Sequence, residues 1–152
     1  MIDSKSLAFA IGLFFVFAGA GAQAADWRRV GQRDAAGTTF YLDVDSPRRD
    51  VDGKIVATVL LDFSTERRAP DARTYMSSTR VVRFDCGAER LADQAIIFYA
   101  EPRGGGAVVR RMERSAEQAN ADLESTDSQS SGKALAYAAC EVYARGKPSS
   151  GK

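Results

Sequence analysis

Apolar and polar residues alternate in a series of short segments between residues 27 and 112. In one of these segments, Phe40 and Leu42 share one side, and Tyr41 and Asp43 share the other. Because successive side chains of a strand point to opposite faces, this period of two is typical of a β-strand. Turn-forming stretches separate the segments, and no long helical pattern lies between them. The series therefore predicts an antiparallel sheet.

About six segments are expected to form strands. The most hydrophobic of them is apolar on both sides, as in a central strand whose two faces are covered. A turn is expected at Asp34–Gly37, between the first two segments. In chain order, the expected strands are Trp27–Gln32, Thr38–Asp43, Lys54–Ser64, Thr74–Cys86, Leu91–Ala100 and Ala107–Met112.

The pattern changes after Glu113. Residues Ser115–Lys133 are polar and have no usable period, so we expect a mobile connection or a frayed helix there. Ala134–Ala144 has a helical period, with Cys140 at the edge of its apolar arc and Ser131 as the N-cap. The predicted fold class is therefore α+β: an antiparallel sheet of about six strands with a C-terminal helix.

The amino-terminal region has the layout of a secretory signal peptide. Lys5 precedes an apolar run from Leu7 to Ala18, and small residues then lead to an Ala22-Gln-Ala24 cleavage site. The alternatives are a membrane anchor or a buried helix, but the run is shorter than the roughly 20 residues that span a bilayer. We expect a cleaved signal at residues 1–24, one domain at 25–145 and a disordered tail at 146–152. No transmembrane helix is expected in the mature chain.

Two cysteines, Cys86 and Cys140, are present. In an oxidising compartment the expected state is an intrachain disulfide, and the alternatives are a reactive thiol or an intermolecular bridge. A nucleophilic cysteine needs a basic neighbour that lowers the pKa of its thiol, and the sequence contains no histidine. A Cys86–Cys140 disulfide would attach the C-terminal helix to the sheet if the two Cα atoms come within about 7 Å.

The charges are almost balanced, with 21 Lys and Arg against 20 Asp and Glu. This balance argues against nucleic acid or anionic lipid as a partner. The absence of histidine excludes Ser-His-Asp and Cys-His catalysis and removes the commonest metal ligand. We therefore expect no enzyme, no cofactor and no metal.

Acidic residues cluster in one turn, at Asp43, Asp45, Asp50 and Asp52. A calcium loop is disfavoured because Pro47 and Lys54 occupy positions that should supply oxygen ligands, so a solvated turn is expected. Asp43 and Asp85 both lie at strand ends, but the sequence does not bring them together as a pair for acid–base catalysis.

Aromatic residues give a weak indication of a binding surface. Tyr and Trp are common anchors at interfaces. At alternating strand positions they more often belong to the core. The residues concerned are Trp27, Tyr41, Tyr75, Tyr99, Tyr137 and Tyr143.

Several short motifs follow one another along the chain. They are Trp27-Arg-Arg-Val-Gly31, Phe40-Tyr-Leu-Asp43 with Asp45-Ser46, Val59-Leu-Leu-Asp62, Ser77-Ser78, Phe84-Asp85-Cys86 with Arg90, and a single cysteine in a C-terminal helix. This series resembles the surface-adhesin protein E family of Gram-negative bacteria over most of the chain from Asp26 to Tyr143. The resemblance implies a six-stranded antiparallel sheet with a disulfide-tethered C-terminal helix and a tendency to form homodimers. It also implies binding of host extracellular matrix or serum proteins such as vitronectin, laminin and plasminogen.

Two features depart from the family pattern. No cysteine follows Ala24 to accept a lipid, although the named member of the family is lipid-anchored, and the Ser-rich connection Glu117–Lys133 is longer. The leading hypothesis is an exported adhesin-like protein at the cell surface or outer membrane. The alternative is a periplasmic structural or envelope-associated module of the same fold, and an enzyme comes third. No ligand-binding residue is transferred from the family.

Overall fold

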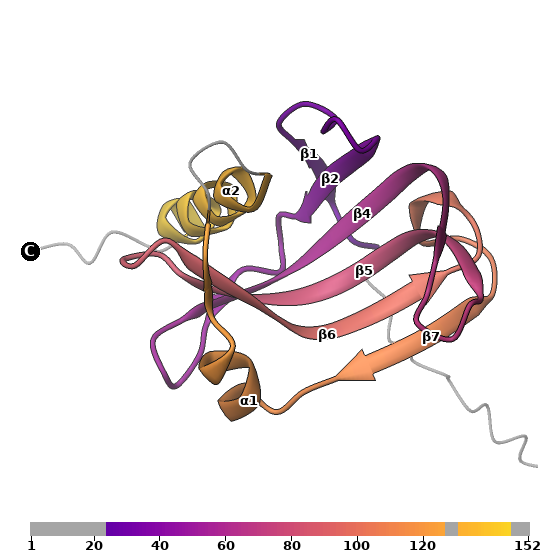
Figure 1. Cartoon of the computed structure of the whole chain (residues 1–152). Helices are drawn as coiled ribbons and strands as arrows, with labels where there is room; N and C mark the ends of the chain where they lie inside the picture. The colour runs from indigo at the N-terminus through magenta and orange to yellow at the C-terminus, as the bar shows by residue number, and fades with distance from the viewer. Residues whose placement is uncertain (1–23, 127–130, 147–152) are drawn as a thin grey trace, which may run out of the picture.

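The sheet is antiparallel throughout, and its main strands follow the order β1-β2-β4-β5-β6-β7. Two further strands of two residues each, β3 and β8, pair with β4 and β6. In this computed structural model, residues 24–126 and 131–146 are described (Figure 1). The strands are β1 Trp27–Val30, β2 Thr38–Asp43, β3 Arg48–Arg49, β4 Ile55–Arg68, β5 Thr74–Asp85, β6 Arg90–Tyr99, β7 Val108–Glu113 and β8 Glu124–Ser125.

Three helical segments accompany the sheet: the 3-10 turn η1 (Pro102–Gly104), α1 (Ala116–Ala121) and α2 (Ser131–Gly146). The helices α1 and α2 lie on opposite sides of the sheet (Figure 1). The predicted α+β fold, with about six main antiparallel strands and a C-terminal helix, is confirmed.

The strand register divides the side chains between two faces. Leu42 pairs with Val59, and both are buried against α2, so we call this side the helix face. The neighbouring positions Tyr41 and Leu60 pair with each other and point to the opposite side, which we call the far face. The core on the helix face consists of Phe40, Leu42, Ile55, Ala57, Val59, Leu61, Phe63, Val82 and Phe84 from the sheet with Leu135, Ala136 and Ala139 from α2.

The hairpin of β4 and β5 is longer than the sequence predicts. The strand β4 was expected to end at Ser64, but it continues to Arg68, past an irregularity in its pairing with β5. The tip of the hairpin lies near β7, where the Asp71 carboxylate is 3.7 Å from the Arg110 guanidinium.

The polar connection after β7 contains more structure than the sequence predicts. A mobile connection or a frayed helix was expected there, and the segment forms the helix α1 and the short strand β8. Ser131 is the first residue of α2 and not its N-cap, and Gly146 ends that helix instead of beginning a tail. Residues 1–23, 127–130 and 147–152 lie outside the described part of the chain, so the signal peptide and the rest of the tail stay predictions. No helix within the described ranges is long and apolar enough to cross a membrane.

Candidate binding surface

The disulfide joins the turn after β5 to the C-terminal helix. Cys86 and Cys140 are bonded, and their Cα atoms are 6.1 Å apart across 54 residues of sequence. The predicted intrachain disulfide is confirmed. The strand expected to end at Cys86 ends at Asp85, so Cys86 lies exposed in the turn that follows it.

Beside the disulfide, Asp85 is held by two hydrogen bonds. The Lys54 ammonium donates to its carboxylate, and the backbone N–H of Ala88 donates to Oδ1 at 3.1 Å. The bond from Lys54, followed by the bond from Ala88, lowers the pKa of the Asp85 carboxyl below its ordinary value of 3.8. This carboxylate therefore stays ionised and fixes the turn that carries Cys86.

Asp85 does not form an acid–base pair with Asp43. Leu42, next to Asp43, pairs with Val59, whereas Phe84, next to Asp85, pairs with Ile55 four positions earlier on β4. At about 3.3 Å per strand residue, the two carboxylates are too far apart to share a proton.

The acidic turn is divided between two structural roles. Asp43 accepts the backbone N–H of Asp45 at 3.2 Å, so it shapes the turn after β2. Asp50 and Asp52 contact the buried guanidinium of Arg83, so the expectation of a solvated turn holds only for part of the cluster. Among the described residues, no three acidic or Cys side chains are grouped so as to hold a metal ion.

Arg83 points to the far face of β5 and is only 2 % exposed. Its Nε donates to Asn120 at 3.0 Å, and its Nη1 donates to Gln94 at 3.2 Å. Its Nη2 contacts Asp52 at 3.1 Å and also pairs with Asp50. Four side chains from the β3–β4 turn, β6 and α1 thus satisfy one buried cation, and this network holds α1 against the sheet.

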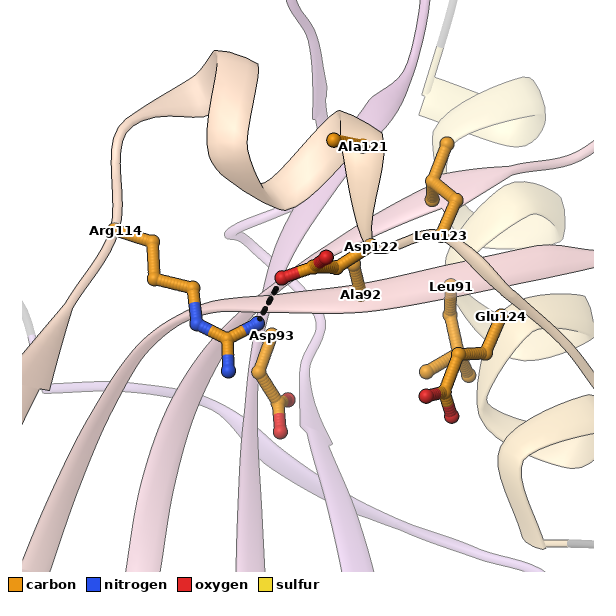
Figure 2. Close-up of a pocket in the computed structure, with 8 residues that line it drawn as sticks. All are labelled: Leu91, Ala92, Asp93, Arg114, Ala121, Asp122, Leu123 and Glu124. Atoms are coloured by element: carbon orange, nitrogen blue, oxygen red, sulfur yellow. Dashed lines mark hydrogen bonds and ion pairs between the residues drawn. The ribbon is translucent and has the colours of Figure 1, made fainter.

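A polar cavity of about 400 Å³ lies between β6 and the α1–β8 segment (Figure 2). Arg114 and Asp122 on one side of it form an ion pair at 2.9 Å. Asp93 pairs with Arg80 at 2.8 Å. The lining contains no hydroxyl, thiol or imidazole side chain, and its ionisable groups are Asp93, Arg114, Asp122 and Glu124. The lining residues are Leu91, Ala92, Asp93, Arg114, Ala121, Asp122, Leu123 and Glu124.

The candidate aromatic residues do not form one surface. Tyr75 belongs to the interior, with its ring centroid 5.5 Å from Phe63 and 4.7 Å from Phe98. Tyr137 is 69 % exposed on α2. Tyr41 lies on the far face under the guanidinium of Arg103, 4.5 Å from its ring centroid. Sequence reasoning named Tyr41 but missed Arg103, which reaches it from η1, 62 residues further along the chain.

The comparisons with known proteins agree with this architecture. The model of the family described as surface-adhesin protein E matches residues 27–141. Two solved structures of Haemophilus influenzae protein E are similar, each with 15 % sequence identity and a TM-score of 0.55. The match to crystal form II covers 78 % of this chain and 89 % of that chain, and the other covers 80 % and 89 %. At this identity the structures support the fold. No curated protein matches.

Proposed function

This chain belongs to the surface-adhesin protein E family, and we propose that it is an exported, non-catalytic binding protein that attaches to host extracellular matrix or serum proteins. The family match over residues 27–141 is the observation that carries the proposal. The disulfide agrees with a location outside the cytoplasm, because such bonds persist in oxidising compartments.

The structure supports a binding role through its rigidity. The disulfide and the Arg83 network hold both helices against one sheet. A pre-ordered surface loses less conformational entropy when a partner binds. The same proposal includes a homodimer, for which the edge strands β1 and β7 offer unpaired backbone groups. Light scattering of the mature chain measures that state directly.

Binding to a panel of immobilised vitronectin, laminin and plasminogen tests the main proposal. We expect saturable binding of the purified mature chain to at least one of them, with serum albumin as the negative control. Flat responses across the whole panel would count against the host-protein function.

A second candidate is a periplasmic structural or envelope-associated module of the same fold. The observation that favours it is the use of both cysteines in the Cys86–Cys140 bond, which leaves neither thiol for a lipid. External protease on intact cells, repeated after osmotic shock and followed by immunoblot, separates the two candidates. Digestion of intact cells, with a periplasmic marker spared, supports surface display. Protection until shock supports the periplasmic module.

A further inference from the structure

The loop between β6 and β7 holds an arginine in a backbone conformation that favours glycine. Arg103 has φ 61° and ψ 30°. Its N–H donates to Asp62 Oδ1 at 2.8 Å, and the N–H of Gly104 donates to Ser77 Oγ at 2.9 Å. The buried Ser77 hydroxyl in turn donates to the Glu101 carbonyl at 2.6 Å. Such conformations persist where the surrounding structure over-determines them, and they gather at ligand-binding sites.

The side chain of Arg103 is fixed as firmly as its backbone. Its guanidinium lies over the Tyr41 ring, and its Nη1 donates to the Tyr41 hydroxyl at 2.9 Å. A guanidinium has five N–H donors, and this contact uses one of them. Arg103 is exposed, so its other donors face solvent in a position that the ring defines.

Two more arginines lie around Tyr41 on the far face. Arg29 is its register partner on β1, and side chains of such a pair lie roughly 5 Å apart at Cβ. Arg33 donates from Nε to the hydroxyl of Thr39 at 3.2 Å, and Thr39 shares the face of Tyr41 because it precedes it by two positions. We call Arg29, Arg33, Tyr41 and Arg103 the Arg–Tyr surface.

None of the three guanidinium groups of this surface forms an ion pair with any carboxylate in the described ranges. The arginines that do form ion pairs there are Arg73, Arg80, Arg83, Arg110, Arg114 and Arg145. Two acids, Asp43 and Asp62, share this face, and one carboxylate oxygen of Asp62 is bound to the Arg103 backbone. The Arg–Tyr surface is therefore a local concentration of positive charge on a chain whose net charge is +1.

We propose that the Arg–Tyr surface binds an acidic segment of a protein partner, through carboxylates that accept paired N–H bonds from the guanidinium groups. The proposal rests on the binding function proposed above and names its surface and its ligand chemistry. Tyr and Arg dominate the binding energy of protein interfaces, and the half-buried Trp27 lies on the same face. A sulfated polysaccharide is less well matched, because Asp43 and Asp62 share this face with only three cations.

Immobilised poly-L-glutamate tests the proposal with the mature chain, and poly-L-lysine is the control polymer. We expect binding that weakens as salt rises. Arg29→Ala and Arg103→Gly should each weaken it by about fivefold or more. Glycine at position 103 removes the guanidinium and suits the positive φ, so this variant should stay folded.

Arg28→Ala is the matched control. Arg28 is exposed and adjacent to Arg29, but it pairs with Leu42 and so points to the helix face. It removes the same charge from the same strand, and binding should change by less than about twofold. Equal losses for Arg28→Ala and Arg29→Ala, or unchanged binding of folded Arg103→Gly, would overturn the proposal. Binding of heparin without binding of poly-L-glutamate would overturn it in favour of a polysaccharide.

The same variants separate this proposal from the host-protein function. If poly-L-glutamate binds through Arg29 and Arg103 while the matrix panel stays unbound, the Arg–Tyr surface stands and the host-protein function fails. If wild type and Arg29→Ala bind the panel equally and poly-L-glutamate stays unbound, the host-protein function stands and the surface fails.

Discussion

Arg83 shows how a single residue joins separate parts of this fold. Its neighbours on β5, Val82 and Phe84, point into the core on the helix face, so Arg83 points to the far face. The residue is almost fully buried there, and a buried cation without partners would be strongly destabilising. The planar guanidinium of Arg83 has N–H groups that point in fixed and different directions toward its partners, and a lysine ammonium does not have this geometry.

Arg83→Ala should lower the free energy of unfolding by about 3 kcal/mol, because it removes the partner of two carboxylates and two amides. Arg83→Lys should recover only part of this loss. Urea unfolding of the purified variants measures both effects. Arg80→Ala is the control on the same strand, since its half-exposed pair with Asp93 should contribute less than about 1 kcal/mol. Equal losses at Arg80 and Arg83 would contradict the role given to burial.

Asp85 gives the fold a dependence on pH. Its pKa is lowered in the folded state by Lys54 and Ala88, so its contribution to stability is present above the ordinary value of 3.8. That contribution is lost as the pH falls through the folded pKa. Asp85→Asn should therefore reduce stability at neutral pH by less than about 1 kcal/mol, as expected for a half-exposed pair. The difference should shrink below about pH 4.

Urea unfolding across the acid range checks this expectation. Lys54→Met provides the control background, because it removes the first partner of Asp85, and Asp85→Asn should have a smaller effect there. A difference between wild type and Asp85→Asn that stayed constant into strong acid would contradict the assignment.

At the scale of single elements, α1 depends on its cap. Ser115 accepts the N–H of Gln118 at 3.1 Å, and the Gln118 side chain accepts the N–H of Ser115 at 2.9 Å. This reciprocal capping box begins a helix of six residues that is too short to be stable alone. The helix also presents Asn120 to Arg83 and buries Ala119 against the sheet.

Ser115→Ala should reduce stability by about 1 kcal/mol through the lost cap. Hydrogen exchange should show the effect locally, as faster exchange of the amides of Ala119 and Asp122. Ser125→Ala, which changes an exposed serine in β8, is the control and should leave these amides unchanged. Uniformly faster hydrogen exchange of the amides over the whole sheet would instead indicate that α1 does not unfold separately.

The strands were predictable from sequence where burial imposes a period of two. Phe40 and Leu42 alternate with polar neighbours, and the structure places both in the core. The end of β4 was missed because Thr65 to Arg68 are polar and are held by pairing with β5, which leaves no apolar pattern. A frayed helix was one of two expectations for the region of α1, and the spacing of Ser115 and Gln118 as a capping box would have favoured it.

The candidate binding residues were less predictable than the fold. Tyr41 was named as an aromatic candidate, whereas Arg103 directly precedes three glycines in the sequence and was not named. Their contact spans 62 positions, and no local pattern indicates it. Two partners of Arg83 are also distant in sequence, since Asp52 precedes it by 31 positions and Asn120 follows it by 37. Long-range pairing of charged and polar groups depends on tertiary packing that a single sequence does not display.

At the scale of the whole molecule, the disulfide decides whether α2 stays on the sheet. The Cys86→Ser, Cys140→Ser double variant should lose about 4 kcal/mol by the chain-entropy estimate for a 54-residue separation. Urea unfolding measures the total loss, and hydrogen exchange should show α2 opening before the sheet. Met76→Leu, a conservative change in β5, is the control and should cost less than about 1.5 kcal/mol. Wild-type exchange rates in α2 of the double variant would mean that Leu135, Ala136 and Ala139 hold the helix unaided.

The order of the main strands bears on how the chain acquires its structure. Each main strand after β1 pairs with the main strand that precedes it along the chain. The short strand β3, which lies between β2 and β4 in sequence, is outside this series. During synthesis from the amino end, each new main strand can therefore pair with the main strand that was made before it. Cys86 is synthesised 54 residues before its partner. The bond can therefore form only after the chain has been made as far as Cys140 in the last helix.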